Sequence, residues 1–382
     1  MTGFSSIEIC AGAGGQALGL QQAGFEHLAL VEIDSDAVET LKLNFERRAG
    51  WERDHCDILS ADVRTFDPLR DLDPANLARL RHHDLDLLAG GVPCPPFSYA
   101  GKQLGKDDER DLFPRMLELV ELLKPRAVMI ENVRGIMDPK FSSYRDWITA
   151  KLEGGMHFGD NGQFIDEVGL GYTVSKWDIL EAHDFGVPQL RPRAILVAFR
   201  NDVIKNATYQ WPARTNSVPV TFAGSLEKSM HERFSRYFDG SSWGDARESF
   251  ARWLRKAREH GGVAPTLVGG SKKHGGADLG PSRAKAAWRQ LGVDPMGVAN
   301  DIETSAVKGT EERDLFRPDG PMLTVQQAAI IQGFPLEWQF SGGKTAQYRQ
   351  VGNAFPPPVA RAVGESIIEV LKASRAADRL AS

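Results

Sequence analysis

Residues 1–200 alternate short apolar runs with amphipathic segments, and this alternation restricts the possible folds more than any other feature. Helical periodicity covers Ala17–Ala23, Ala37–Phe45 and Leu112–Leu123, and strands are predicted at Ser6–Cys10, His27–Ile33, His55–Ile58, Asp86–Ala89, Ala127–Ile130, Tyr172–Ile179 and Ala194–Phe199. Strands separated by helices form a parallel sheet with helices on both faces. We therefore expect an α/β protein with a doubly wound, mostly parallel sheet that binds ligands beyond the carboxyl ends of its strands.

The alternation stops after Arg200. Residues 201–219 are rich in proline, asparagine and threonine, and residues 261–280 include seven glycines. A helical pattern returns near Thr324, and Ala360–Leu371 predicts a last helix followed by a frayed tail. These changes predict one domain of residues 1–200 and 345–382, and a smaller irregular domain of residues 201–344. In the smaller domain we expect Trp243, Trp253 and Trp288 to be core residues.

The charge is unevenly distributed along the chain. The net charge of −5 argues weakly against binding to nucleic acid, but residues 214–300 carry 14 Lys and Arg against 8 Asp and Glu. This segment has a net charge of +6 and leaves −11 for the remainder. A basic segment in an acidic protein suits a phosphate backbone, although a solvated face would have the same composition.

The chain has 3 cysteines, widely spaced and without a Cys-x-x-Cys pair. This pattern argues against a disulfide framework and a structural zinc site, so no metal is expected. No apolar run is long enough to span a bilayer, and the first residues do not form a signal peptide. We therefore expect a cytoplasmic protein that does not bind membranes.

A glycine turn follows the first predicted strand at Gly12-Ala13-Gly14-Gly15. It could bring the backbone close to a ligand or simply form a turn. Glu32 ends the second strand, where a carboxylate can accept both hydroxyls of an adenosine ribose, and Asp57 could accept from the adenine amino group. The third glycine of the dinucleotide fingerprint is missing, so S-adenosylmethionine, which has no pyrophosphate, fits at least as well as NAD or FAD.

Cys94 lies in GGVPCPPFS, between two prolines that restrict the backbone after a predicted strand. The turn alone is compatible with a catalytic thiolate or with a small buried side chain. Glu131 ends the next strand and is expected nearby, unless it is a surface residue in a salt bridge. Arg191 and Arg193 are two residues apart in an extended segment, so both guanidiniums are expected to face one site.

Eight motifs together resemble the DNA (cytosine-5-)-methyltransferase family. They occur in the family's order, chiefly within residues 5–200 and 320–370: ICAGAGG, VEID, CDI, GGVPCPPFS, ENV, QLRPR, LTVQQAAIIQGFP and QYRQVGNAFPPPVA. The resemblance implies a Rossmann-like, S-adenosylmethionine-dependent methyltransferase with a small domain that recognises the DNA target. The target cytosine would be flipped out of the duplex, because a stacked base cannot expose carbon 6 to attack.

The resemblance also assigns roles to particular residues. Cys94 would add to carbon 6 of the cytosine, Glu131 would hold or protonate ring nitrogen 3, and Arg193 would bind the carbonyl oxygen. Arg191 would hold a loop, Glu131 or a phosphate. The cofactor would contact Cys10, Ala11, Gly12, Ala13, Gly14, Gly15, Glu32, Ile33, Asp57, Ile58, Asn353 and Ala354, and the DNA would contact Ser98, Lys272, Lys273 and Arg283.

Two positions depart from the family pattern. Cys10 stands where the family usually has phenylalanine, and Pro95 stands where it commonly has glutamine. The first change alters the packing around the cofactor. The second removes an amide that could contact DNA, but neither change removes a group that the reaction needs.

The predicted partner is double-stranded DNA, bound by a monomer in the nucleoid of a bacterium, with a cognate restriction endonuclease acting separately. The branch of this family that modifies transfer RNA is a close alternative, and the long basic segment favours duplex DNA over it. A catalytically silent DNA-binding homologue is disfavoured because Cys94, Glu131, Arg191 and Arg193 are all present. A nicotinamide or flavin oxidoreductase is disfavoured by the missing glycine.

Overall fold

The computed structural model describes residues 3–45, 56–93, 111–159, 162–205, 207–215, 220–240, 243–260, 262–269 and 277–381. The chain forms two compact units, and each is described by itself. Unit 1 comprises Met1–Leu180, Pro192–Ala213 and Val359–Ser382, and unit 2 comprises Glu181–Arg191 and Arg214–Pro358. The expected boundaries differ from these, because residues 181–191 and 345–358 belong to the second unit rather than to the first, and residues 201–213 belong to the first rather than to the second.

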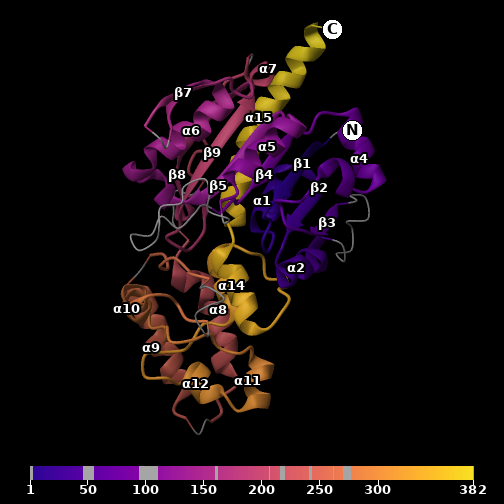
Figure 1. Cartoon of the computed structure of the whole chain (residues 1–382). Coiled ribbons are helices and arrows are strands. Elements are labelled where there is room, and N and C mark those ends of the chain that lie inside the picture. The colour runs from indigo at the N-terminus through magenta and orange to yellow at the C-terminus, as the bar shows by residue number, and fades with distance from the viewer. Residues whose placement is uncertain are drawn as a thin grey trace. The chain divides into compact units, whose positions relative to one another are not determined.

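Unit 1 is built on a seven-stranded sheet in the order β3-β2-β1-β4-β5-β9-β8 (Figure 1). The strands are β1 Phe4–Ile9, β2 Phe25–Glu32, β3 Asp57–Ser60, β4 Leu87–Gly90, β5 Ala127–Val133, β8 Tyr172–Glu181 and β9 Pro192–Arg200. The four pairs from β3 to β5 are parallel, and β9 is antiparallel to β5. The predicted fold class is confirmed. The strand order reverses between β1 and β4, which is where such sheets bind ligands.

Helices connect these strands. They are α1 Gly15–Ala23, α2 Ser35–Phe45, α3 Pro68–Asp71, α4 Pro74–His82, α5 Phe113–Leu123, α6 Ser142–Glu153 and α7 Asn201–Ile204, with 3-10 turns η2 Arg134–Met137 and η3 Pro139–Phe141. A separate hairpin is formed by β6 Gly155–Phe158 and β7 Phe164–Glu167. Central strand residues such as Ile7, Leu88 and Val128 are fully buried, because helices cover both faces of the sheet.

A close approach of two strands explains the glycine that ends β4. A Cβ atom on Gly90 would lie 2.7 Å from Cγ1 of Ile9, the last residue of β1. Only glycine therefore lets β1 and β4 end side by side at the switch point. The local packing places the glycine turn after β1 and the residues after β4 at the same edge of the sheet.

The C-terminal helix α15 spans Pro357–Ala381, so the predicted frayed tail after Leu371 is wrong for the described residues. In unit 1 this helix packs against α1, and Figure 1 shows it in yellow beside the indigo N-terminal elements. Arg375 donates to both carboxylate oxygens of Asp86, at 2.9 and 2.7 Å. The tail is ordered because its charged side chains pair with buried groups of the sheet.

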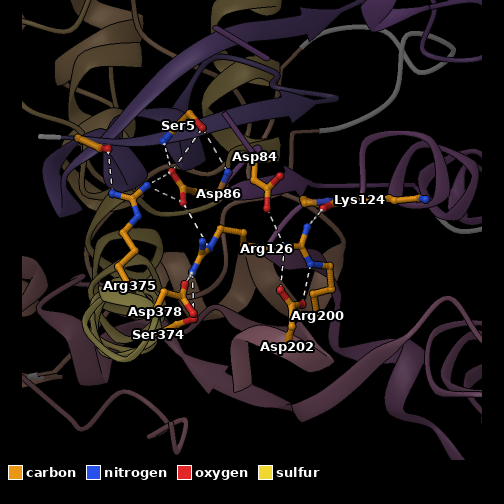
Figure 2. A network of polar contacts seen from close by, with 12 residues as sticks. Ser5, Asp84, Asp86, Lys124, Arg126, Arg200, Asp202, Ser374, Arg375 and Asp378 are labelled. Atoms are coloured by element: carbon orange, nitrogen blue, oxygen red, sulfur yellow. Dashed lines mark hydrogen bonds and ion pairs between the residues drawn. The ribbon is translucent and has the colours of Figure 1, made fainter. Parts of the chain in front are cut away.

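Figure 2 shows the polar network that these contacts form. Asp86 also accepts from the backbone N–H of Ser5, at 2.9 Å, and lies 3.8 Å from Arg126. Arg126 in turn donates to the hydroxyl of Ser374 on α15, at 2.9 Å. The side chain of Asp86 is only 3% exposed, and burial raises its pKa, so its carboxylate depends on these partners.

Substituting Arg375 by alanine is expected to destabilise the protein by about 2–3 kcal/mol, because it leaves a buried carboxylate without its bidentate partner. The half-exposed position of Arg375 keeps the loss below that of a fully buried pair. Arg361→Ala is a matched control on the same helix, since Arg361 pairs with Glu365 at the surface. Urea denaturation would show the loss for Arg375→Ala and a change below about 1 kcal/mol for the control.

Unit 2 is mostly helical. Its helices are α8 Phe222–Ser235, α9 Ala246–Glu259, α10 Ser282–Gln290, α11 Ile302–Lys308, α12 Glu311–Leu315, α13 Val325–Gln332 and α14 Lys344–Asn353, with a 3-10 turn η4 Ala182–Phe185. Trp253 and Trp288 are fully buried against Phe222, as expected for core residues. Trp243 is 39% exposed and packs on Tyr237, so it lies at the edge of the core.

Within the described ranges, no helix combines the length and apolar character that crossing a membrane requires.

Candidate active site

The glycine turn after β1 is held against the end of β2. Gly12 and Gly14 have positive φ angles of 54° and 81°, which favour glycine. One carboxylate oxygen of Glu32 accepts from the backbone N–H of Gly12 at 2.7 Å, and the other accepts from Ile33 and Asp34 at 2.8 Å each. These three donors fix the carboxylate of Glu32 at the edge of the sheet, which is the position that the ribose assignment requires.

A cavity of about 420 Å³ opens beside this carboxylate, within the size range of small-molecule sites. Three of the expected cofactor residues, Cys10, Glu32 and Ile33, lie in its wall. Further wall residues, which sequence analysis missed, are Val31, Ala61, Asp62, Val63, Arg64, Pro93 and Leu112. Apolar walls with carboxylates at one side suit a planar adenine ring attached to a ribose.

The other residues of the glycine turn are alanine and glycine, so only their backbone could contact a ligand. Ala11 and Ala13 are buried, and Gly15 begins α1. Cys10 has a positive φ of 54°, and burial raises the pKa of its thiol to about 12. Cys10 is therefore a neutral thiol in the cavity wall. Ile33 is 64% exposed at the same edge, as expected for a residue that would cover a bound ring.

The structure corrects the prediction that Asp57 and Ile58 contact the adenine. Asp57 begins β3 and pairs with Ala29, whereas Glu32 pairs with Ser60. Asp57 therefore lies three residues, or about 10 Å, back from the carboxyl edge of the sheet. Its carboxylate accepts from the backbone N–H of Asp73 at 2.8 Å, before α4. The strand is longer at its carboxyl end than its apolar pattern indicated.

Asp62 and Val63 take the places assigned to Asp57 and Ile58. Both follow the end of β3 and lie in the wall of the cavity. Arg64 donates to both carboxylate oxygens of Asp62, at 3.0 and 2.6 Å, and these bonds lower the pKa of Asp62. An ionised carboxylate at this edge can accept from an exocyclic amino group. The signal in the sequence was the second acidic–aliphatic pair, ADV, five residues beyond CDI.

Glu131 and Arg193 form an ion pair across β5 and β9, with Nε of Arg193 2.7 Å from Oε1 of Glu131. Both side chains are largely buried, at 14% and 12% exposed. A Cβ on Gly91 would lie 3.1 Å from Oε2 of Glu131, so the carboxylate lies over the residues that follow β4. Gly91 is three residues before Cys94 in the sequence. Cys94 and Ser98 themselves lie outside the described residues.

Asn132, the middle residue of ENV, connects β5 to the residues that follow β4. Its side-chain amide is buried and donates to the carbonyl oxygen of Val92 at 2.8 Å. The backbone N–H of Leu112 contacts the carbonyl of Pro93 at 3.3 Å. The two residues before Cys94 are thus held to the sheet and to the segment before α5. No local pattern predicts this role for Asn132, because its partner is 40 residues away.

Arg191 does not share a site with Arg193 as the spacing predicted. β9 begins at Pro192, so Arg191 precedes the strand and the i, i+2 rule does not apply to it. Its guanidinium is buried in unit 2 and donates to the backbone carbonyls of Leu267, Gly352 and Ala354, at 2.8, 2.7 and 2.9 Å. Arg191 therefore binds protein backbone in unit 2, whereas Arg193 binds the carboxylate of Glu131.

The remaining expected residues are also in unit 2. Asn353 ends α14 and Ala354 follows it, so both belong to a different unit from the cavity beside Glu32. Arg283 is exposed in the first turn of α10, as a residue that contacts phosphates must be. Lys272 and Lys273 lie outside the described residues.

A buried carboxyl group, Glu8, lies in β1 near the carboxylates of Glu32 and Glu131. It is 1% exposed, and its Oε2 has no hydrogen-bond partner among the described residues. Burial raises the pKa of Glu8 well above its usual range, and the charges of Glu131 and Glu32 raise it further. The folded protein therefore holds the proton of Glu8 more tightly than the unfolded chain does.

A raised pKa in the folded state means that stability falls as the pH rises through it, because the folded protein must then release a proton that it binds more tightly than the unfolded chain. We expect Glu8→Gln to remove this component and to stabilise the protein at pH 8 by about 1–3 kcal/mol. Urea denaturation at pH 5 and pH 8 would measure it. An equal pH dependence in both proteins would contradict the role of Glu8.

Comparison with known proteins identifies the family. A family model described as C-5 cytosine-specific DNA methylase matches residues 4–369. Type II methyltransferase M.NaeI of Lentzea aerocolonigenes is 45% identical over 369 residues, which cover 96% of this chain and 75% of that protein. Type II methyltransferase M.NgoMIV of Neisseria gonorrhoeae is 42% identical, over 97% of this chain and 98% of that protein.

Solved structures show the same fold. A putative DNA modification methyltransferase encoded in an Escherichia coli prophage matches with a TM-score of 0.57 at 22% identity, covering 97% of this chain and 99% of that one. A Spodoptera frugiperda DNMT2 variant matches with a TM-score of 0.54 at 16% identity, over 97% and 99%. With the family match across nearly the whole sequence, the chain belongs to the C-5 cytosine-specific DNA methylases.

Proposed function

We propose that the protein methylates carbon 5 of a flipped-out cytosine within a specific sequence of double-stranded DNA. The observation that carries the proposal is the ion pair of Glu131 and Arg193, which lies over Gly91, three residues before the cysteine of the matched family's motif. A carboxyl group and a guanidinium at this place can bind the nitrogen 3 and carbonyl edge of a cytosine. Carbon 5 needs such help, because it is too weak a nucleophile in the intact ring.

In the proposed reaction the Cys94 thiolate adds to carbon 6, and the electron pair of the carbon 5–carbon 6 double bond moves onto carbon 5. Glu131 holds or supplies a proton at nitrogen 3, so that negative charge does not build up on the ring. Arg193 donates to the carbonyl oxygen. After methylation, the proton on carbon 5 leaves to a base, and the returning electron pair reforms the double bond and expels Cys94.

S-adenosylmethionine supplies the methyl group in this proposal. The residues around the cavity beside Glu32 fit its adenosine part, because the backbone donors fix Glu32 and the pair of Asp62 with Arg64 keeps a second carboxylate ionised. In the glycine turn, Gly12 is partly exposed and has no atom within 4 Å of a Cβ placed on it, so a ligand could approach its backbone. Asn353 and Ala354 remain assigned to the cofactor by the resemblance.

Bisulfite sequencing of DNA from cells that express the protein would test the function and identify the target at once. We expect 5-methylcytosine at one position of one short sequence, and its absence with a folded protein would overturn the proposal. Purified protein should transfer labelled methyl groups to duplex DNA. Transfer to transfer RNA alone would instead support the RNA-modifying branch of the family.

The relatives' names also guide the biological setting. M.NaeI and M.NgoMIV are named Type II methyltransferases, so the protein is proposed to protect bacterial DNA in the cytoplasm from a separate restriction endonuclease. The proposed form on DNA is a monomer. DNA from expressing cells should resist one restriction enzyme that cuts at the methylated sequence, and cleavage of fully methylated DNA by the cognate enzyme would contradict this role.

A pair of substitutions tests the corrected cofactor site. Asp62→Ala should weaken S-adenosylmethionine binding about 10-fold, the loss expected for a charged hydrogen bond. Asp57→Ala should leave this affinity unchanged, since Asp57 accepts from Asp73 instead. Isothermal titration calorimetry with S-adenosylhomocysteine would measure both affinities. Weaker binding by Asp57→Ala alone would restore the original assignment.

A further inference from the structure

One side of the cavity beside Glu32 is formed by the segment that follows β3, residues 61–66, which we call the wall turn. Its first four residues lie in the wall of the cavity. The backbone N–H of Ala61 donates to the carbonyl of Glu32 at 3.0 Å, which fixes the start of the wall turn to the end of β2. The carbonyl of Asp62 accepts from the backbone N–H of Phe66 at 3.0 Å. The wall turn is thus a closed loop of backbone that presents Asp62 to the cavity.

Arg115, in the first turn of α5, holds the other end of the wall turn. Its Nε donates to the carbonyl of Val63 at 3.1 Å, and its Nη2 donates to the carbonyl of Phe66 at 2.7 Å. Its Nη1 pairs with Glu118 at 2.6 Å. A guanidinium is planar and rigid, so one side chain fixes the directions of the two carbonyls that follow Asp62 on the wall turn.

The stability of α5 alone would not favour an arginine at this place. The first turn of a helix carries a partial positive charge, which disfavours a cation there. The first turn of α5 has no acidic residue that would offset this charge. Glu118 is 61% exposed, so its pair with Arg115 adds little. The bonds to the wall turn are therefore the main favourable interactions of this guanidinium.

A ligand in the cavity would contact the wall turn and not Arg115. Arg115 is not among the residues of the cavity wall, and each of its three guanidinium nitrogens has a partner in the protein. Turning the guanidinium toward a ligand would leave the carbonyls of Val63 and Phe66 without their donor. Any effect of Arg115 on a bound ligand therefore passes through the backbone of the wall turn.

The group that depends most on this backbone is the carboxylate of Asp62. Its pair with Arg64 keeps it ionised, and an ionised carboxylate only accepts hydrogen bonds. It can therefore bind the 6-amino group of a purine, whereas a 6-oxo group would meet it with a second acceptor. Hydrogen bonds weaken steeply when the donor is out of line, so this choice requires a fixed direction of the wall turn.

We propose that Arg115 is a positioning residue for the cofactor: it holds the carbonyls of Val63 and Phe66, and so fixes the wall turn in the one arrangement in which Asp62 selects a 6-aminopurine over a 6-oxopurine. The inference rests on the proposed function, which assigns S-adenosylmethionine to this cavity. Two arginines share the task. Arg64 holds the carboxylate of Asp62, and Arg115 holds the backbone that carries it.

The test compares the affinities of S-adenosylhomocysteine and S-inosylhomocysteine, in which an oxygen replaces the amino group of the adenine. Arg115→Met keeps the length of the side chain and removes its donors. We expect it to weaken the adenosyl ligand about 10-fold and the inosyl ligand less than about 3-fold, because the inosyl ligand has no bond to Asp62 to lose. Arg115→Lys can donate to one of the two carbonyls and should lie between. Isothermal titration calorimetry would measure each affinity.

A double variant shows whether Arg115 acts through Asp62. In the Asp62→Ala background, Arg115→Met should change the affinity for S-adenosylhomocysteine by less than about 2-fold, since the bond that it orients is already absent. The single-turnover rate of Arg115→Met at saturating S-adenosylmethionine should stay within about 3-fold of wild type. A residue needed only for folding would not show this dependence on the Asp62 side chain.

Arg79→Met is the matched control. Arg79 has nearly the same exposure as Arg115, at 24% against 22%, and pairs with Glu26 in the same unit, away from the cavity wall. Both affinities should keep their wild-type values in this variant. If Arg115→Met does not fold, Arg115→Lys gives the same comparison, and an unchanged ratio of the two affinities in the folded lysine variant would overturn the inference.

Two further results would overturn it. One is an equal loss of affinity for both ligands in Arg115→Met, which would mean that Arg115 does not act on the choice of the purine. The other is a full additional loss in the Asp62→Ala background. Folded wild-type protein that does not bind S-adenosylhomocysteine would contradict the proposed function instead, and the two failures are therefore distinguishable.

Discussion

Replacing Cys94 by serine is expected to reduce methyl transfer about 10⁴-fold or more, while binding to target DNA survives. A serine hydroxyl is a far weaker nucleophile than a thiolate at neutral pH, and without addition to carbon 6 no electron pair reaches carbon 5. Single-turnover transfer from labelled S-adenosylmethionine would measure the rate, and a gel-shift titration would measure binding to DNA.

Cys56→Ser is the matched control. Cys56 is half-buried just before β3, outside the cavity and outside the pair of Glu131 and Arg193, so its substitution should leave the transfer rate unchanged. DNA containing 5-fluorocytosine gives an independent measurement. Fluorine replaces the proton that must leave, so wild-type protein and the Cys56→Ser variant should form a denaturant-resistant complex. Trapping by Cys94→Ser as well would show that another residue attacks the base.

Substituting Glu131 by glutamine should slow the transfer step about 10²–10³-fold at saturating substrates. The amide keeps the size of the side chain but cannot supply a proton to ring nitrogen 3, and it leaves the largely buried Arg193 without its ionic partner. The affinity for S-adenosylhomocysteine should stay the same, because Glu131 is not among the residues of the cofactor cavity.

Glu118→Gln is the control for this substitution, since Glu118 is 61% exposed and pairs with Arg115 at the surface. The single-turnover rate of Glu118→Gln should match the wild-type rate and exceed that of Glu131→Gln by about 10²–10³-fold. Rates measured for Arg193→Ala and for the double variant Arg193→Ala/Glu131→Gln complete a double-mutant cycle. Additive losses would contradict the view that the pair acts as a unit at one base.

The sequence was informative wherever a function depends on local backbone. The glycine turn and Glu32 are adjacent to strand ends, and parallel strands bring such ends to one edge, so their meeting could be predicted without coordinates. The neighbouring positions of β4 and β5 likewise placed Glu131 beside the residues that follow Gly90. Local pattern and sheet topology were sufficient for these positions.

The errors came from strand boundaries and from distant partners. An error of a few residues in β3 made Asp57 seem the end of the strand, when Asp62 follows it. β9 begins one residue after Arg191, which removed the basis for pairing it with Arg193. Asn132 was missed because its partner is the backbone carbonyl of a residue that no periodicity connects to it.

The ion pair of Asp86 and Arg375 joins two segments that the ribosome synthesises at different times. The sheet begins at Phe4, but Arg375, the bidentate partner of Asp86, lies on α15, 289 residues further along the chain than Asp86. Until α15 has been synthesised, Asp86 therefore has the backbone N–H of Ser5 and the more distant Arg126 as partners but lacks its bidentate ion pair. Products of premature stop codons before Arg375 are consequently expected to be substrates for cellular proteases rather than partly active enzymes.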